Sequence, residues 1–202
     1  MRRRFYLGMC LFIAALLTGT GGCITSAGGE LKAIQAPPAA NPVAIEYVVG
    51  DFRFTLEGGK MVTSNKAGRV LSDAIFKNWV KEHYIESFQY VGQTGFSESS
   101  EHRLTLSGSQ YGDSSVIAQF FSGLTLFVLP YTVDTKYDIQ FLYQNTKTGT
   151  ECSAEVAASY HTIVELLLFV AAPVATKGMN ETFDAMAAHL YDQLHQKCGF
   201  GQ

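Results

Sequence analysis

Three polar side chains near the C-terminus, His189, Asp192 and His195, are of the types that bind metal ions or transfer protons. They follow one another at steps of three residues, so on a helix they spread over about a third of the circumference. That spread is too wide for neighbouring side chains to chelate one ion. They also lie opposite an apolar stripe, and such a face is normally hydrated. We therefore expect a polar surface here, with no metal and no cofactor.

Catalytic motifs with a defined spacing are absent from the sequence. The run 106–112, LSGSQYG, contains two serines but lacks the G-x-S-x-G order of a nucleophile elbow. The chain has neither a glycine-rich phosphate loop nor an H-E-x-x-H zinc motif. The sequence thus favours a protein that is not an enzyme.

The sequence that precedes Cys23 indicates a specific reaction at the thiol of this residue. Cys23 ends the stretch Met1–Cys23, which starts with three arginines, continues with an apolar run over 7–17 and finishes in small residues. This arrangement is typical of a secretory signal peptide. The apolar run is shorter than the roughly 20 residues that span a bilayer. Small residues fit a narrow peptidase cleft, and the cysteine after them offers a thiol that can accept a lipid.

The segment 20–23, Thr-Gly-Gly-Cys, resembles the lipobox of bacterial lipoproteins. The resemblance implies cleavage before Cys23 and attachment of lipid, palmitate included, to its thiol. Thr20 departs from the pattern, since the family usually has leucine there, so ordinary signal cleavage near Ala27 stays open as the alternative. Ile24 stands where an inner-membrane retention signal would usually carry aspartate. The resemblance thus implies the periplasmic face of the outer membrane.

Cys152 and Cys198 remain as a pair once the signal peptide is removed and Cys23 carries lipid. In an oxidising periplasm such a pair favours a disulfide. The bridge would close a loop of about 46 residues, worth roughly 4 kcal/mol in the loop-entropy model. Two buried free thiols are the alternative. A zinc site is disfavoured, because neither cysteine has a second ligand at suitable spacing.

The composition of the 202-residue chain is 47 % hydrophobic and 16 % charged, with a formal net charge of −3. Without the signal peptide (1–22), this length suits a single domain with a sizeable core. Removing its three arginines from the 15 basic residues leaves 12 against 18 acidic residues, a net charge of −6. An acidic chain without a basic run argues against nucleic acid as a partner and against electrostatic docking on anionic lipid.

Periodicity predicts one α+β domain over 46–202. Before it, residues 23–45 are small, polar and rich in glycine and proline, which indicates a lipid anchor and a flexible tether spanning about 26 Å. Helical stripes predict helices over about 66–86 and 180–198. Alternating residues predict strands, the clearest being 137–143 and 152–160, which the turn 145–149 joins in a hairpin. We expect an antiparallel sheet of about four or five strands with both helices on one face.

Two apolar segments flank the predicted hairpin: 116–133, which has no charged residue, and 163–175, which has one. Because the first enters the hairpin and the second leaves it, both should lie at its open end. They form either buried core, or an exposed lobe that meets the membrane or a protein partner, or, least favoured, a spanning hairpin. In the lobe interpretation the contact residues are Phe120, Phe121, Leu124, Leu126, Phe127, Leu166, Leu167 and Phe169.

These features predict a non-enzymatic cell-envelope lipoprotein. It would act as a binding or scaffold subunit, attached to the membrane through its lipid and offering its domain to an envelope protein partner. Two alternatives stay open. One is a lipid-handling or transport auxiliary whose apolar segments line a cavity. The other is a periplasmic hydrolase whose catalytic residues carry no recognisable motif.

Overall fold

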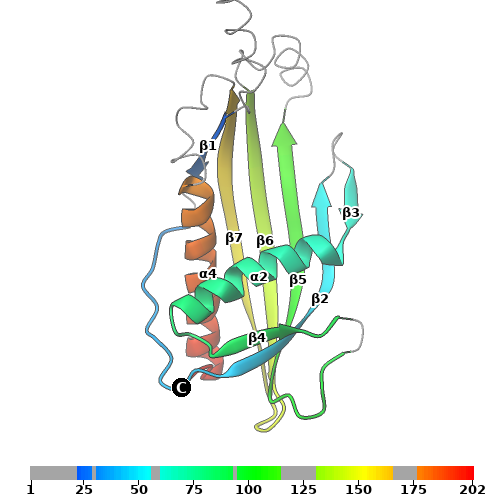
Figure 1. Ribbon diagram of the computed structural model, residues 1–202, viewed down its shortest axis with the longest axis vertical. Coiled ribbons are helices and arrows are strands. Elements are labelled where there is room, and N and C mark those ends of the chain that lie inside the picture. Colours follow the sequence, from blue (N-terminus) through cyan, green and yellow to red (C-terminus); the bar gives the residue numbers. More distant parts are fainter. Residues whose placement is uncertain (1–21, 29–30, 56–59, 93–94, 115–130, 166–176) are drawn as a thin grey trace, which may run out of the picture.

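The computed structural model describes residues 22–28, 31–55, 60–92, 95–114, 131–165 and 177–202. In this part of the chain seven strands form one sheet, and two helices pack on one face of it (Figure 1). The strands are β1 (Gly22–Ala27), β2 (Ala44–Thr55), β3 (Met61–Thr63), β4 (Ser87–Tyr90), β5 (His102–Ser114), β6 (Tyr131–Asn145) and β7 (Thr150–Glu165). The helices are α2 (Asn65–Lys81) and α4 (Lys177–Cys198).

The α+β class is confirmed, but the predicted number of strands was too small and the predicted pairing too simple. The order across the sheet is β1-β7-β6-β5-β2-β3, and β4 also pairs with β2. β2 runs parallel to both β4 and β5, so the sheet is mixed and not purely antiparallel. Helix α2 lies between β2 and β4 in the chain and provides the crossover that parallel strands require. β3 was missed because three residues are too few to show an alternating pattern, and β1 was missed because its six residues do not alternate between apolar and polar types.

The predicted hairpin is confirmed and is longer than expected. β6 and β7 pair from Asn145↔Thr150 to Tyr131↔Val164. The Asn145 side chain closes the turn by accepting hydrogen bonds from the backbone N–H groups of Lys147 and Thr148, at 2.9 and 3.0 Å. Gly149 has φ +73°, a left-handed conformation that glycine adopts without strain.

Helix α2 begins and ends by identifiable local interactions. Ser64 is the N-cap, and its Oγ accepts a hydrogen bond from the Ala67 N–H at 3.3 Å. The helix ends at Lys81, before the predicted residue 86, because His83 takes a left-handed φ of 60°. α4 begins at Lys177, three residues before the predicted start.

The core lies between the two helices and the inward face of the sheet. Trp79 of α2 packs on Phe141 of β6 and donates its indole N–H to the Ala187 carbonyl of α4 at 2.8 Å. β7 presents alanines to α4, among them Ala154 and Ala158, so the helix can approach the strand closely. The core thus holds both helices on the same face of the sheet, with α2 against β2 and α4 against β7 (Figure 1).

Helix α4 also covers the edge of β7 that β1 leaves free. The side-chain amide of Gln193 bonds the β7 backbone in the way that a neighbouring strand would. Its oxygen accepts a hydrogen bond from the Glu155 N–H at 3.2 Å, and its NH₂ group donates to the Glu155 carbonyl at 2.6 Å. Lys197 donates to the Ser153 carbonyl at 3.3 Å. These contacts satisfy backbone groups that an open strand edge would expose.

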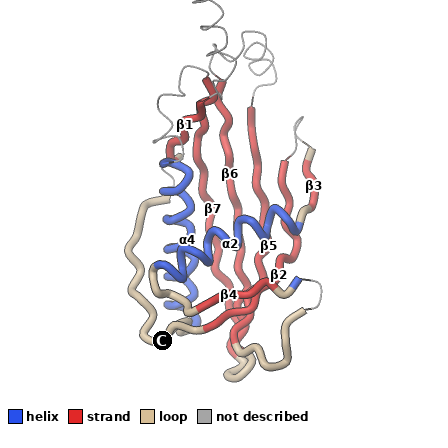
Figure 2. The backbone as a smooth tube through the Cα atoms, viewed as in Figure 1, coloured by secondary structure: helices blue, strands red, loops and turns tan. Residues whose placement is uncertain are grey.

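Residues 31–43 have no helix or strand, yet they are attached to the domain along their length (Figure 2). The Lys32 carbonyl accepts a hydrogen bond from His189 at 2.7 Å, and the Ala36 carbonyl accepts one from the Tyr84 hydroxyl at 3.3 Å. Asn41 donates its side-chain amide to the Gln202 carbonyl at 3.1 Å. We call residues 31–43 the strap.

Neither α2 nor α4, the helices of the described residues, combines the length and apolar character needed to cross a membrane.

Candidate functional site

Cys23 is the second residue of β1, an edge strand of the sheet. β1 pairs antiparallel with the last part of β7, from Gly22↔Glu165 and Cys23↔Val164 to Ala27↔Tyr160. The residue that the sequence predicts to carry lipid is therefore placed by backbone pairing at one end of the longest strand.

The first turn of α4 holds β1 from the second side. The Thr25 hydroxyl accepts a hydrogen bond from the Met179 N–H at 3.1 Å. Gly178 lies so close to β1 that a Cβ atom added to it would be 2.4 Å from Ser26 Cα. Only a glycine permits this backbone approach. β1 is thus clamped between β7 and α4.

Both apolar segments connect to the end of the sheet where Cys23 lies. Ser114, two residues before the first segment, pairs with Val133, the last residue of that segment. Tyr131 of the first segment pairs with Val164 of the second, and Glu165 of the second segment pairs with Gly22. We call this end of the sheet, where β1 and β6 begin and β5 and β7 finish, the anchor end (Figure 1).

The proposed contact residues of the two segments lie outside the described part of the chain. They are Phe120, Phe121, Leu124, Leu126, Phe127, Leu166, Leu167 and Phe169. The outermost residues of the predicted segments, 131–133 and 163–165, do belong to strands of the sheet.

Among the described residues, three large apolar side chains are exposed. Of the three large ones, Ile163 is 38 % and Tyr111 is 44 % exposed, and both lie in the last stretches of their strands. Val70 on α2 is the third. Isolated exposed apolar residues need no explanation, but Ile163 pairs with Ile24 of β1 and therefore lies one rung from Cys23.

The predicted disulfide is present at the opposite end. Cys152 of β7 and Cys198 of α4 are bridged, with their Cα atoms 6.3 Å apart. Cys152 pairs with Tyr143, two rungs from the hairpin turn. The bridge therefore joins the last turn of α4 to the end of the hairpin that lies away from Cys23, which we call the turn end.

The three polar residues of α4 do not converge on a metal. His189 Nε2 bonds the Lys32 carbonyl of the strap at 2.7 Å, and His195 Nδ1 bonds the Phe200 carbonyl at 2.7 Å. Since a carbonyl only accepts, both imidazoles act as donors in these bonds. Asp192 accepts a hydrogen bond from Gln196 at 2.8 Å. Among the described residues no group of three or more histidines, cysteines and carboxylates could hold a metal ion.

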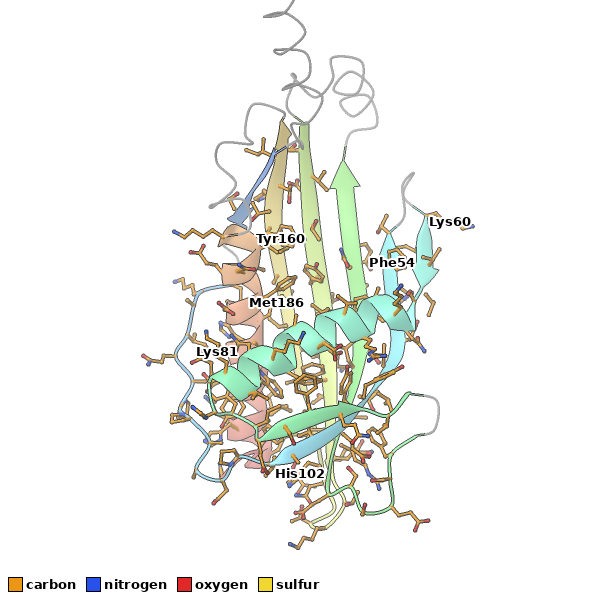
Figure 3. The ribbon with its side chains drawn as sticks, in the orientation of Figure 1. Phe54, Lys60, Lys81, His102, Tyr160 and Met186 are labelled. Carbon is orange, nitrogen blue, oxygen red and sulfur yellow. A yellow bond between two sulfur atoms is a disulfide. The ribbon has the colours of Figure 1, made fainter. Side chains whose placement is uncertain are left out.

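A polar cluster around His102 was not singled out from the sequence. His102 Nδ1 lies 2.8 Å from the Tyr143 hydroxyl, and burial lowers the pKa of the imidazole. Figure 3 shows His102 at the turn end of the sheet. The residue lines two cavities there, of about 500 and 280 Å³. His102 shares the inward face of Leu104 and Leu106, and this alternation could have indicated its burial.

The polar groups beside His102 have structural roles. The Ser100 hydroxyl donates to the His102 carbonyl at 3.5 Å and not to the imidazole, so it is not activated as a nucleophile. Glu46 accepts hydrogen bonds from the Ser97 N–H and hydroxyl at 2.8 and 2.7 Å, which lowers its pKa. Both contacts fix the loop between β4 and β5.

Comparison with known proteins gives loose structural similarity only. No protein-family model and no curated protein match the chain. A protein described as a neuraminyllactose-binding hemagglutinin homolog from Helicobacter pylori aligns with TM-score 0.44 and 10 % identity, covering 85 % of this chain and 93 % of that one. A Xanthomonas campestris protein of family DUF330 aligns with TM-score 0.35 and 8 % identity, covering 81 % and 90 %.

A third similar structure is the PelC dodecamer from Paraburkholderia phytofirmans, with TM-score 0.31 and 9 % identity over 87 % of this chain and 95 % of that one. At these TM-scores the similarity is too loose to assign a fold family or a function.

Proposed function

We propose that the protein is a non-enzymatic lipoprotein of the cell envelope, held at the periplasmic face of the outer membrane by lipid on Cys23 and serving as a binding or scaffold subunit. One observation carries the proposal. The anchor end joins the lipobox-like cysteine, in β1, to the strands from which both apolar segments leave. Two independent sequence signals for membrane attachment thus meet at one place in the fold.

The physical reason for combining the two signals is the strength of attachment. A single acyl chain binds a bilayer only marginally, so stable anchoring combines several contacts, and a lipoprotein cysteine that carries more than one acyl chain is strengthened by any further apolar contact. Apolar side chains beside the lipidated residue provide such a contact. The net charge of −6 without the signal peptide gives no electrostatic attraction to anionic lipid, so the second contact must be apolar.

The sheet face that carries no helix is suited to water or to a polar protein partner. Gln140 donates to Glu155 at 2.7 Å and Gln144 donates to Glu151 at 3.2 Å, so neighbouring strands are linked by polar side chains across this face. A rigid sheet that displays such groups away from its attachment site supports a scaffold role.

Cell fractionation tests the proposal. We expect the wild-type protein in the outer-membrane fraction and the Cys23→Ala variant free in the periplasm. Cys10→Ala is the matched control, because that cysteine lies within the predicted signal peptide and should not affect attachment. Wild-type protein found in the soluble periplasm would contradict the proposal.

A lipid-handling role is the second candidate, because the structure contains a suitable cavity. The cavity has a volume of about 440 Å³ and lies between the strap, β7 and the first half of α4. Leu31, Ile34 and Ala185 contribute apolar walls, and Glu181 and Asp184 lie among the lining residues. This volume is within the usual range of small-molecule sites. Lipid that co-purifies with Cys23→Ala, and is lost when Ala185→Phe fills the cavity, would support this role.

A further inference from the structure

We propose that the anchor end of the sheet docks directly on the bilayer surface, with no free tether between lipid and domain. This inference rests on the proposed function, in which Cys23 carries the lipid. The composition of residues 23–45 predicts a coil that lifts the domain away from the membrane. The structure gives these residues a different arrangement.

The first reason is the position of Cys23 within β1. If Cys23 is the first residue of the mature chain, the lipid is attached at the start of a strand that is already paired with β7. The Thr25 hydroxyl and the close contact of Gly178 with Ser26 hold the same strand against α4. No unattached residue remains between the lipid and the sheet.

The second reason is the path of the chain after β1. Gly28 donates its N–H to the Ser159 carbonyl at 2.9 Å, which continues the attachment to β7. The strap is then bonded through Lys32, Ala36 and Asn41 before β2 begins. The described residues that follow β1 are therefore also attached to the domain, so they leave no free length of chain that would lift it from the membrane.

The third reason is the direction of the strands. β6 and β7 run along the long axis of the molecule from the anchor end to the hairpin turn (Figure 1). At about 3.4 Å per residue, Thr132 and the turn are about 45 Å apart. With Cys23 at the membrane the sheet stands end-on, so Ile163 lies beside the lipid and the polar turn points into the periplasm.

The occupant of the docking surface is the bilayer and not a protein. The lipid on Cys23 inserts there, and Ile163, which is 38 % exposed, is an apolar side chain next to the rung formed by Cys23 and Val164. Because the mature chain is acidic, docking should not be strengthened by anionic lipid. A protein partner would compete with the bilayer for the same end and is distinguished by the second experiment below.

A cross-linking experiment tests whether β1 stays paired in the lipidated protein. Ser26 and His161 are exposed register partners, so Ser26→Cys with His161→Cys should form a disulfide in the full chain purified from membranes. Ser26→Cys with Ala157→Cys is the control, because Ala157 is exposed on the same strand but about 13 Å further along. A free tether would let both pairs react to similar extents.

Energy transfer to the bilayer tests the orientation. The full lipidated chain is placed in phosphatidylcholine vesicles that contain acceptor-labelled lipid, with a donor on Thr132→Cys or on Lys147→Cys. Both positions are exposed, and the native cysteines are lipidated or bridged. We expect strong transfer from position 132, weak transfer from position 147, and no increase in either when anionic lipid is added.

The outcomes separate the inference from the proposed function. An acylated N-terminal peptide with selective Ser26–His161 cross-linking and unequal energy transfer supports end-on docking. An acylated peptide with equal transfer from the two positions overturns the inference and leaves the lipoprotein assignment intact. Weak transfer from both positions in vesicles would show that a protein, and not lipid, covers this end. An unmodified Cys23 would overturn the proposed function.

Discussion

The two ends of the sheet are built differently. At the turn end, the connection between β6 and β7 is short and polar, its backbone bonds to the Asn145 side chain, and a disulfide joins the hairpin to α4. At the anchor end, the connections that follow β5 and β7 are long and apolar in sequence, and the added strand is β1 with Cys23. One end holds the fold together, and we propose that the other attaches it to the membrane.

This difference has a consequence for stability and function. Substitutions at the turn end should change the free energy of unfolding without changing where the protein is located. Substitutions that release β1 should disturb the attachment while most of the core persists. The following variants test that separation, and all unfolding measurements use the unacylated Cys23→Ala form.

The largest effect is expected at the turn end, from removal of the disulfide. Cys152→Ala with Cys198→Ala opens a loop of 46 residues and should lower the free energy of unfolding by about 4 kcal/mol. Urea unfolding measures the loss, and the parent protein reduced with dithiothreitol is the control because it lacks the same constraint. An unchanged midpoint would show that the bridge does not constrain the unfolded chain.

A smaller and local effect is expected at the anchor end. In Gly178→Ala the new Cβ would lie 2.4 Å from Ser26 Cα, so β1 must move, at a cost of about 1–3 kcal/mol. Hydrogen exchange should accelerate in β1 more than in β6. Gly112→Ala is the matched control, since nothing lies within 4 Å of its added Cβ. Equal exchange in β1 of both variants would show that α4 does not clamp this strand.

The smallest effect concerns pH and the buried imidazole of His102. Burial lowers its pKa in the folded state, so the unfolded chain binds the proton more tightly. The contribution of the neutral imidazole to the free energy of unfolding is fully present above the ordinary histidine pKa of about 6.5. It is lost as the pH falls through the lowered pKa of the folded state. His102→Gln should therefore weaken the decline in the urea midpoint between about pH 7 and pH 5. An identical decline in the variant would assign the pH dependence to other groups.

The sequence predicted the parts of this fold whose residues repeat regularly. Alternating aromatic and polar residues located the hairpin, apolar stripes located both helices, and the cysteine count indicated the disulfide. β1 could not be predicted, because Gly-Cys-Ile-Thr-Ser-Ala has no alternation and its pairing depends on β7, more than 130 residues away. The parallel pairing of β2 with β5 likewise depends on long-range contacts that local patterns do not encode.

The candidate site was predicted in part for the same reason. Cys23 was recognised from its local neighbours, and the hairpin placed both apolar segments at one end. The clamp formed by Thr25, Ser26 and Gly178 was missed, because its members are about 150 residues apart and none is unusual for its type. Glycine at 178 gave the only local signal, since it stands in the first turn of a helix that has no need of it.

The account depends most directly on the chemistry at Cys23, which the intact mass of the protein purified from membranes can determine. We predict a chain that begins at Cys23, carries a diacylglyceryl group with a further acyl chain, and is two hydrogens lighter than the reduced polypeptide because Cys152 and Cys198 are bridged. A chain that begins near Ala27, or one with an unmodified Cys23, would contradict the account.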